Sequence, residues 1–161
     1  MGQRPQFVEE IHELGFEAER ALDELRSLAH GVYPPLLTDM GLPDALQSIA
    51  RQAPLDVHVV AVGITRHPIE IESAVYFTCA EALQNAVKHA HGATVVWIRL
   101  NQSRARLHFE IRDDGTGFSP SDHAGRGLRN MHDRIEAIGG QITIEATRPN
   151  GTRVVGFVRL P

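Results

Sequence analysis

Three short stretches of the sequence contain residues whose types and spacing could hold a charged ligand. Glu81 and Asn85 stand four apart in EALQNAVKHA, so they share one face of a predicted helix. A predicted strand runs into DDGTG at 113–117, and GRGL at 125–128 precedes another predicted helix. An acid, an amide and two glycine turns in this order indicate a nucleotide held against the backbone, with a metal ion beside it.

The pair on the helix predicts metal-assisted chemistry. The amide oxygen of Asn85 suits a Mg²⁺ ion that bridges phosphates, and an inward-facing Asn without hydrogen-bond partners would cost roughly 1–3 kcal/mol. Glu81 could polarise an attacking hydroxyl, imidazole or water. Lys88 is the only lysine of the chain and lies three residues after Asn85, where its ammonium could reach a phosphate. The alternative interpretation is a solvated polar stripe on a surface helix.

The first glycine turn follows a strand that ends at Asp113. A buried carboxylate at this position could accept a hydrogen bond from an exocyclic amine such as that of adenine. Gly115 and Gly117 permit positive φ and a close approach of the ligand to the backbone. An ordinary turn is the alternative, because Asp-Asp-Gly favours turns in any protein. Asp114 is expected only to be solvated.

The second glycine turn predicts an anion site. Free amides at a helix N-terminus, together with the helix dipole, bind anions, and Arg126 and Arg129 could add positive charge. The short polar segment SPSDHA at 119–124 is expected to act as a lid. The alternative is a flexible loop before a glycine-capped helix. The sequence has no GxxxxGK[ST] motif and no glycine at position 130, so neither a P-loop nor a dinucleotide fingerprint is present.

The elements that must position these residues follow from periodicity and turn signals. Helices are expected at 6–30, 44–53, 71–89 and 128–138, strands at 57–62, 94–100, 107–112, 141–146 and 153–160, and a loop at 32–43. The first helix carries a heptad-like apolar stripe and ends before Pro34 and Pro35. The short connections NQSRA and RPNG require antiparallel pairing. We therefore expect an α/β fold, a two-layer sandwich in which a mixed sheet has helices on one face.

The composition limits the class of protein. The chain has 161 residues, 42% of them hydrophobic, which fits one domain with a small extension. It shows no apolar run long enough to span a membrane and no signal peptide, and its net charge of −4 argues against non-specific nucleic-acid binding. Cys79 is the only cysteine and is expected to be buried, as is Trp97. His89 and His91 do not face one another on a helix and predict no zinc site.

Taken together, the motifs from about residue 40 to 161 resemble those of the ATP-binding domain of bacterial sensor histidine kinases, which has the Bergerat fold. Glu81 to Asn85 resembles the N box, 113–117 the G1 box, 125–128 the G2 box and Gly151-Thr152 the final glycine box. The stretch LRSLAHGVYPPLLTDMGLPDAL resembles the junction in the subfamily with the short, alternative dimerisation domain. The resemblance implies that residues 1–31 are the second helix of a dimerisation hairpin, 32–43 a linker and 44–161 the catalytic domain.

The resemblance implies ATP and Mg²⁺ as ligands. Within it, Asn85 holds the metal ion, Asp113 selects adenine and Lys88 reaches a phosphate, while Glu81 assists phosphoryl transfer. The other positions implied to line the nucleotide site are His89, Gly115, Gly117, Gly125, Arg126, Gly127, Leu128 and Thr152. The implied phosphoryl path runs from ATP to a histidine and then to an aspartate of a response regulator. A cytoplasmic location is implied as well, and it is compatible with a membrane-anchored parent protein.

The chain departs from this family in its N-terminal region. In these kinases the phosphate acceptor lies on the first helix of the dimerisation hairpin, whereas the only heptad helix here leads directly into the ATP-binding domain. His12 is only fourteen residues before Arg26, too close to be that acceptor. We therefore expect a chain that binds ATP but needs a separate histidine-bearing dimerisation helix, and whose residues 6–30 could form a weak homodimer.

Three other classes of protein share parts of this pattern. An anti-sigma-factor-type serine kinase would act by binding its partner, and it would have no dimerisation hairpin. An ATP-driven conformational machine would need a longer lid and a transducer domain. A non-catalytic interaction module would have a degenerate site, against which the intact Glu81, Asn85 and Asp113 argue.

Overall fold

The structure is a computed structural model that describes residues 33–117, 126–146 and 151–161. It also describes positions 11, 14, 15, 17, 18, 21, 22 and 25, all of them helical, but not the side chain of Arg126. Most of the predicted helix at 6–30, including His12, lies outside the described residues. So do the predicted lid at 119–124 and all of the RPNG turn except Gly151.

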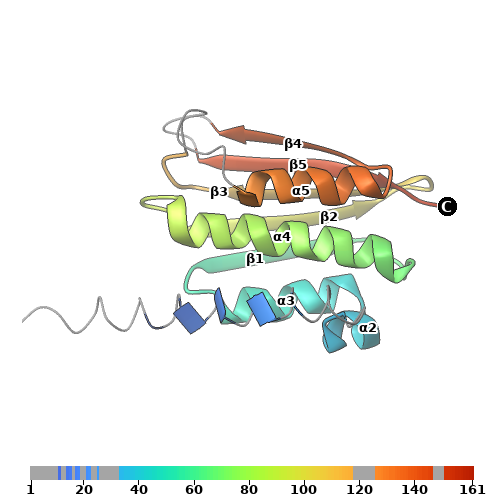
Figure 1. Cartoon of the computed structure of the whole chain (residues 1–161), viewed down its shortest axis with the longest axis horizontal. Coiled ribbons are helices and arrows are strands. Elements are labelled where there is room, and N and C mark those ends of the chain that lie inside the picture. The colour runs from blue at the N-terminus through green and yellow to red at the C-terminus, as the bar shows by residue number, and fades with distance from the viewer. Residues whose placement is uncertain are drawn as a thin grey trace, which may run out of the picture.

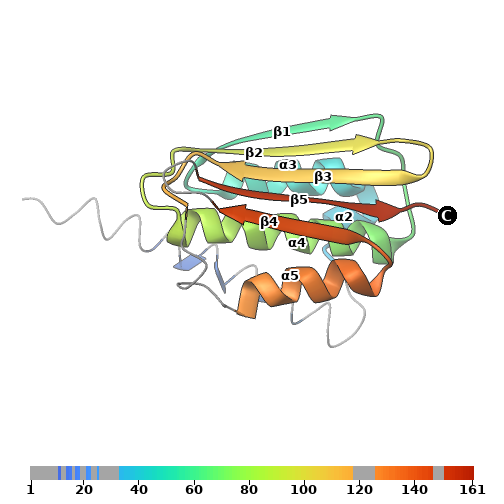
Figure 2. The same cartoon turned by 90° about the horizontal axis from the view of Figure 1, so that it is seen from above.

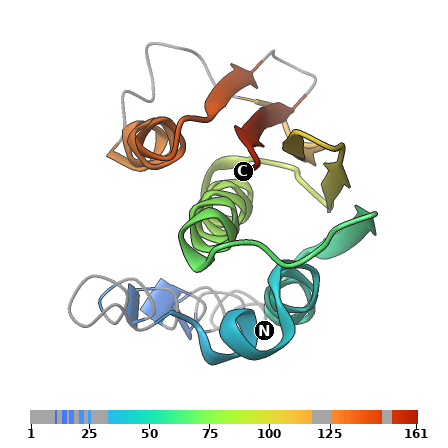
Figure 3. The same ribbon diagram turned by 90° about the vertical axis from the view of Figure 1, so that its right-hand side faces the viewer.

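The described chain forms a two-layer α/β sandwich, as predicted (Figures 1 and 2). The sheet has the order β1-β2-β3-β5-β4; β1 is parallel to β2, and the remaining neighbours are antiparallel. Its strands are β1 (Asp56–Val62), β2 (Val95–Gln102), β3 (Arg106–Asp113), β4 (Gln141–Ala146) and β5 (Thr152–Arg159). The helices are α2 (Pro35–Met40), α3 (Leu42–Gln52), α4 (Ile69–His89) and α5 (Arg126–Ala137). Seen end-on, the helices lie on one side of the sheet (Figure 3).

Helix α4 is the central helix of the helical layer, lying on the sheet between α3 and α5 (Figure 3). It begins after Pro68, which restricts the backbone to an extended N-cap conformation, and Glu70 and Glu72 lie in its first turn. Lys88 and His89 lie in its last turn, so the charges at both ends suit the helix dipole. Burial of most of its sides, rather than one apolar stripe, holds this helix in place and fixes the direction of its polar residues.

The segment predicted as a loop at 32–43 contains helix α2, so that prediction was wrong. Pro34 is the N-cap and Pro35 the first helical residue, positions at which a missing N–H costs nothing. Leu37 is fully buried and anchors the helix against the core. Gly41 ends it with φ of 89°, which a glycine adopts without strain.

The position of Trp97 also differs from the prediction. Alternation along β2 directs Val96, Ile98 and Leu100 towards the helices, where all three are buried. Trp97 therefore points to the face of the sheet opposite the described helices and is only half-buried. Cys79 is fully buried in α4, as expected, and this burial raises the pKa of its thiol.

The C-terminal end of α5 confirms the predicted glycine cap. Gly139 has φ of 73°, and the N–H of Gly140 donates to the carbonyl of Ile135 at 2.9 Å. The cap turns the chain into β4. Within the described part of the chain, no helix combines the length and the apolar character needed to cross a bilayer.

Candidate functional site

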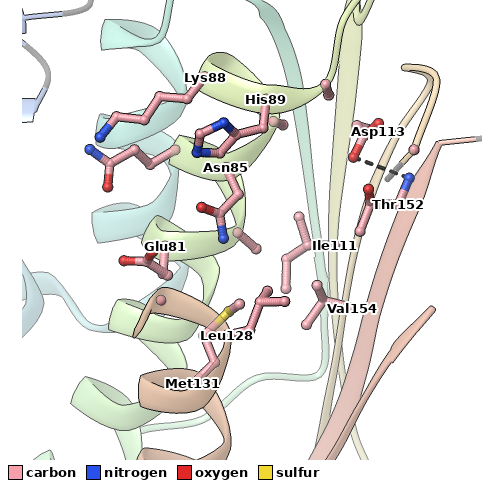
Figure 4. A pocket seen from close by; sticks show the side chains of 16 residues that line it. Glu81, Asn85, Lys88, His89, Ile111, Asp113, Leu128, Met131, Thr152 and Val154 are labelled. Atoms are coloured by element: carbon pink, nitrogen blue, oxygen red, sulfur yellow. Dashed lines mark hydrogen bonds between the residues drawn. The ribbon is translucent and has the colours of Figure 1, made fainter. Parts of the chain in front are cut away.

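A cavity of about 250 Å³ opens between α4, the first turns of α5 and the adjoining ends of β3 and β5. Its size is below the usual range for a whole drug-sized ligand, so it could enclose one part of a nucleotide. The lining residues are Glu81, Ala82, Gln84, Asn85, Ala86, Lys88, His89, Ala90, Ile111, Asp113, Gly117, Gly127, Leu128, Met131, Thr152 and Val154. In Figure 4 the polar side chains of α4 stand on one side and those of the strands on the other.

Asp113 is held rigidly at the sheet side of the cavity. Only 5% of the residue is exposed. Its Oδ1 accepts a hydrogen bond from the Gly115 N–H at 2.9 Å, and its Oδ2 accepts one from the Thr152 N–H at 3.2 Å (Figure 4). Because each carboxylate oxygen can accept more than one hydrogen bond, Asp113 can still accept a bond from a ligand amine.

Glycine is needed at positions 115 and 117 of the first turn for two different physical reasons. Gly117 has φ of 68°, as predicted. Gly115 does not have positive φ, which corrects the expectation for that position. A Cβ at position 115 would lie 2.7 Å from the Cβ of Ala90 and 3.0 Å from its carbonyl oxygen, so glycine is needed for close packing against the end of α4.

Asp114 is exposed, but it does more than interact with water. Its carboxylate accepts hydrogen bonds from the Thr94 hydroxyl at 2.6 Å and from the N–H groups of Thr94 and Val95 at 2.7 and 2.9 Å. The Thr94 hydroxyl, followed by these two N–H groups, lowers the pKa of Asp114 to about 2. The turn after β3 is therefore fastened to the start of β2.

The α4 side of the cavity carries the predicted acid and amide. Glu81 is 8% exposed and Asn85 is half-buried, and both line the cavity with Lys88. A Cβ at Gly127 would overlap Oε1 of Glu81, so the first turn of α5 rests directly on this carboxylate. The ammonium of Lys88 is ion-paired with Glu17 of the N-terminal region.

Apolar side chains form the wall between these two polar sides. Ile111 and Val154 come from neighbouring strands, and Leu128 and Met131 come from α5 (Figure 4). Such a wall suits a flat apolar group with a few polar atoms at its edge, as in a nucleobase. Asp113 lines the cavity beside this wall, where it could contact such polar edge atoms.

Most of the predicted site residues meet in this cavity. Glu81, Asn85, Lys88, His89, Asp113, Gly117, Gly127, Leu128 and Thr152 all line it. Gly115 lies behind the lining, against Ala90. Gly125 and the side chain of Arg126 are outside the described part of the chain, and Arg129 is exposed without lining the cavity.

Sequence reasoning predicted Leu128 but missed Ile111, Met131 and Val154 of the apolar wall. Ile111 stands two residues before Asp113, and Val154 stands two residues after Thr152. Side chains two apart on a strand share one face. This spacing could have predicted that both side chains point into the same cavity as their polar neighbours.

The described residues contain no group of three or more His, Cys, Asp and Glu side chains that could hold a metal ion by themselves. Magnesium bound together with phosphates does not need such a group, because it usually takes one or two protein ligands and keeps several waters. The amide of Asn85, half-buried on the cavity wall, fits this requirement.

Comparison with known families identifies the domain. Residues 70–161 match the family described as "Histidine kinase-, DNA gyrase B-, and HSP90-like ATPase". The chain belongs to this ATPase family. The matched range begins with α4 and ends with β5, so it includes all the described residues that line the cavity.

Two curated proteins are similar to the chain. One is the signal transduction histidine-protein kinase/phosphatase UhpB of Salmonella typhimurium, 34% identical over 139 residues, covering 82% of this chain and 27% of UhpB. The other is the sensor histidine kinase MctS of Rhizobium johnstonii, 30% identical over 142 residues, covering 82% of this chain and 31% of MctS. The chain spans about a third or less of the length of these relatives.

Solved structures support the same ATPase fold. The ATP binding domain of PrrB from Mycobacterium tuberculosis matches with a TM-score of 0.53 at 29% identity, covering 74% of this chain and 90% of that one. The blue-light activated histidine kinase of Erythrobacter litoralis has a TM-score of 0.60 at 21% identity, covering 92% of this chain and 53% of that one. The similarity to sensor histidine kinase ATPase domains inferred from the sequence is thus confirmed.

Proposed function

We propose that this domain binds Mg²⁺-ATP in the described cavity and serves as the catalytic part of a sensor histidine kinase. The γ-phosphoryl group would pass to a histidine on the dimerisation helix of the parent kinase, and from there to an aspartate of a response regulator. The observation that carries the proposal is the convergence of Asn85, Lys88 and Asp113, from two separated segments, on one apolar-walled cavity. The similarity to UhpB and MctS, which are described as histidine kinases, supports the histidine kinase assignment.

The adenine base would bind at the sheet side. The Asp113 carboxylate already accepts hydrogen bonds from the N–H groups of Gly115 and Thr152. It could accept a further hydrogen bond from the exocyclic amine of adenine. Guanine presents a carbonyl oxygen at the equivalent position. This oxygen and the Asp113 carboxylate are both hydrogen-bond acceptors, so they would repel one another. A buried site that hydrogen-bonds one partner discriminates strongly against an analogue that leaves its polar groups unpaired.

The phosphates would bind at the α4 side. Lys88 carries positive charge to the cavity, and the first N–H groups of α5 add the favourable end of a helix dipole. The amide oxygen of Asn85 would hold the magnesium ion, which neutralises phosphate charge when bound. The positioning of the γ-phosphoryl group by these residues, rather than covalent chemistry, would supply most of the catalysis.

Glu81 would act on the nucleophile. Its carboxylate is largely buried on the cavity wall and lies against Gly127 at the start of α5. From this place it could orient the incoming imidazole and hold its proton while the phosphoryl group transfers. The same contact would let Glu81 position the first turn of α5 at the phosphates.

The domain boundaries inferred from the sequence belong to the same proposal. Residues 1–31 would be the second helix of a dimerisation hairpin, 32–43 a linker and 44–161 the catalytic domain. The linker would include α2, which packs into the core through Leu37 and so joins the catalytic domain directly.

Nucleotide titration tests the proposal. We expect ATP, but not GTP, to raise the unfolding temperature, with a larger rise when Mg²⁺ is present. At about 100 times its dissociation constant, a ligand adds roughly 2.7 kcal/mol of stability, which is a shift of about 5–10 °C at this size. Transfer of label from γ-labelled ATP to the separate dimerisation domain of the parent kinase tests the catalytic part.

Two variants test the proposed roles of Asp113 and Asn85. Asp113→Asn should weaken ATP binding by about 10- to 100-fold, because a charge-assisted hydrogen bond contributes roughly 1.5–3 kcal/mol; Asp39→Asn, an exposed residue of α2, is the charge-matched control. Asn85→Ala should remove the Mg²⁺ dependence of binding. Unchanged ATP affinity in Asp113→Asn would refute the adenine assignment, and an unchanged Mg²⁺ response would refute the metal role of Asn85.

A further inference from the structure

An ion pair joins Glu17 of the N-terminal region to the cavity. The ammonium of Lys88, at the end of α4, contacts Oε1 of Glu17. The side chains of Lys88 and Glu17 are 32% and 37% exposed, so this pair is only partly screened by solvent. Lys88 is also a lining residue of the cavity. One cation therefore belongs both to the proposed phosphate site and to a contact with a distant segment of the chain.

The charge balance of the cavity makes this cation important. Among the described residues that line it, Lys88 is the only one with a permanent positive charge, whereas Glu81 and Asp113 are acidic. Among these described side chains, Lys88 is therefore the one that can neutralise part of the charge of a phosphate group that enters the α4 side. The Glu17 carboxylate already neutralises the charge of this ammonium. An incoming phosphate is therefore attracted less strongly by Lys88 and is repelled by the nearby Glu17 carboxylate.

The rest of the N-terminal region adds little apolar burial at its described positions. Ile11, Leu14, Leu22 and Leu25 are between 49% and 64% exposed. These side chains stabilise the docked position weakly, because apolar contacts contribute in proportion to the area removed from water. The ion pair between Glu17 and Lys88 is a polar contact that joins the described residues of this region to α4.

We propose that Glu17 lowers the affinity of the cavity for phosphate-bearing ligands by holding Lys88, so that the contact between Glu17 and Lys88 and the binding of a nucleoside triphosphate oppose each other. This inference rests on the proposed function, since it takes the nucleotide site as given. Coupling between two binding events is reciprocal. Loss of the Glu17 contact raises affinity for the triphosphate, and the bound triphosphate in turn weakens the contact between Glu17 and Lys88.

The test compares the dissociation constants of ATP and adenosine for the parent chain, Glu17→Gln and Glu136→Gln, measured by calorimetry. Glu136 is an exposed carboxylate near the C-terminal end of α5, and its substitution is the charge-matched control. Glu17→Gln should tighten ATP binding by about 2- to 5-fold, the range that a partly exposed ion pair supports. Adenosine, which lacks phosphate, should bind the parent and both variants equally.

A double-mutant cycle tests whether the effect passes through Lys88. In a Lys88→Met background, Glu17→Gln should no longer change ATP affinity, because the shared cation is gone. In the Lys88-containing chain the gain from Glu17→Gln should shrink at high salt, since the ion pair is partly screened.

The outcomes separate this inference from the proposed function. Equal ATP affinity of the parent and Glu17→Gln overturns the inference and leaves the proposed function intact. A gain that is equally large for adenosine, or that persists without Lys88, also overturns it. Absence of ATP binding by the parent chain overturns the proposed function and the inference with it. An ATP-specific gain that requires Lys88 supports both.

Discussion

The Thr94 hydroxyl lies 2.6 Å from Oδ2 of Asp114, and through it the turn that contains the proposed adenine site is fastened to the first residues of β2. The adjacent backbone strengthens this connection, because the Asp114 N–H donates to the carbonyl of Val95 at 3.3 Å. Residue 114 thus holds the turn from outside while Asp113 faces the cavity. Asp114 thus has a structural role, whereas the proposed function gives Asp113 the role of binding the ligand.

The first prediction concerns the pH dependence of stability. The pKa of Asp114 is lowered from 3.8 to about 2 in the folded protein, mainly by the Thr94 hydroxyl. A carboxylate whose folded pKa is depressed contributes stability above its unfolded pKa and loses it as the pH falls through the folded value. Asp114→Asn should therefore be less stable than the parent at pH 7 by about 1 kcal/mol, as expected for lost hydrogen bonds. The difference should shrink between about pH 4 and pH 2.

Urea unfolding of both proteins at several pH values measures this difference. Thr94→Val is the matched partner variant, since it removes the hydroxyl and keeps the branched shape. A stability difference between Asp114→Asn and the parent that stays constant from pH 7 to pH 2 would contradict the assignment of the low pKa to folded-state hydrogen bonds.

The second prediction concerns Gly115. A Cβ at this position would lie 2.7 Å from the Cβ of Ala90, which real side chains do not tolerate. Gly115→Ala should cost about 1–3 kcal/mol of stability, as overpacking does elsewhere. The double variant Gly115→Ala with Ala90→Gly removes the partner methyl group and should recover part of the loss. Equal stability of the single and double variants, measured by thermal unfolding, would argue against this contact.

The third prediction concerns a buried charge that joins α2 to α4. Glu72 is 1% exposed, and its Oε1 accepts from the Arg66 Nε and from the His67 N–H, both at 3.0 Å. Arg66 also donates to the carbonyl of Thr38 at 2.9 Å, at the end of α2. Arg66→Met should cost about 2 kcal/mol, less than for a fully buried pair because the Arg66 side chain is half exposed.

Removal of the second charge supplies the control for this prediction. Adding Glu72→Gln to Arg66→Met should recover part of the stability, since no unpaired carboxylate is then buried. Urea midpoints of the parent, the two single variants and the double variant complete the cycle. If the double variant is as unstable as the sum of the single variants, the two residues do not act as a pair.

The fourth prediction uses Cys79 as a reporter. The thiol is fully buried and its pKa is raised by burial, so it should react with thiol reagents only when the domain opens. ATP at about 100 times its dissociation constant should slow the reaction about 100-fold, because it lowers the open population by that factor. GTP at the same concentration should leave the rate unchanged. A labelling rate that does not respond to ATP would mean that the thiol is reached by a local opening that is not linked to the cavity.

Some features of the fold and site could be predicted because they depend on short-range periodicity. The spacing of Glu81 and Asn85 put both on one helix face, and the structure has both lining the cavity. Alternation of apolar residues located the five strands, and short connections required the antiparallel pairing. These signals are local, so neighbouring residues suffice to define them.

Other features could not be predicted because the local sequence was compatible with two different structures. The two prolines at 34 and 35 indicated a loop, but proline also begins helices, and the burial of Leu37 selected the helical outcome. Trp97 is apolar and was expected in the core, whereas the face it occupies follows from the position of the helices. In each case packing against distant residues decided between two locally acceptable conformations.

The sequence by itself thus determined the order of the elements apart from α2, the shared helix face of Glu81 and Asn85, and the ATPase family, because motif spacing and periodicity are properties of the linear chain. Only the tertiary structure decided which distant groups meet. The contacts of Asp114 with Thr94, of Arg66 with Thr38 and of Glu17 with Lys88 each join segments that are far apart in sequence. Such contacts arise when burial of the apolar faces brings the elements together, and no local pattern encodes which polar side chains will then lie within hydrogen-bonding distance.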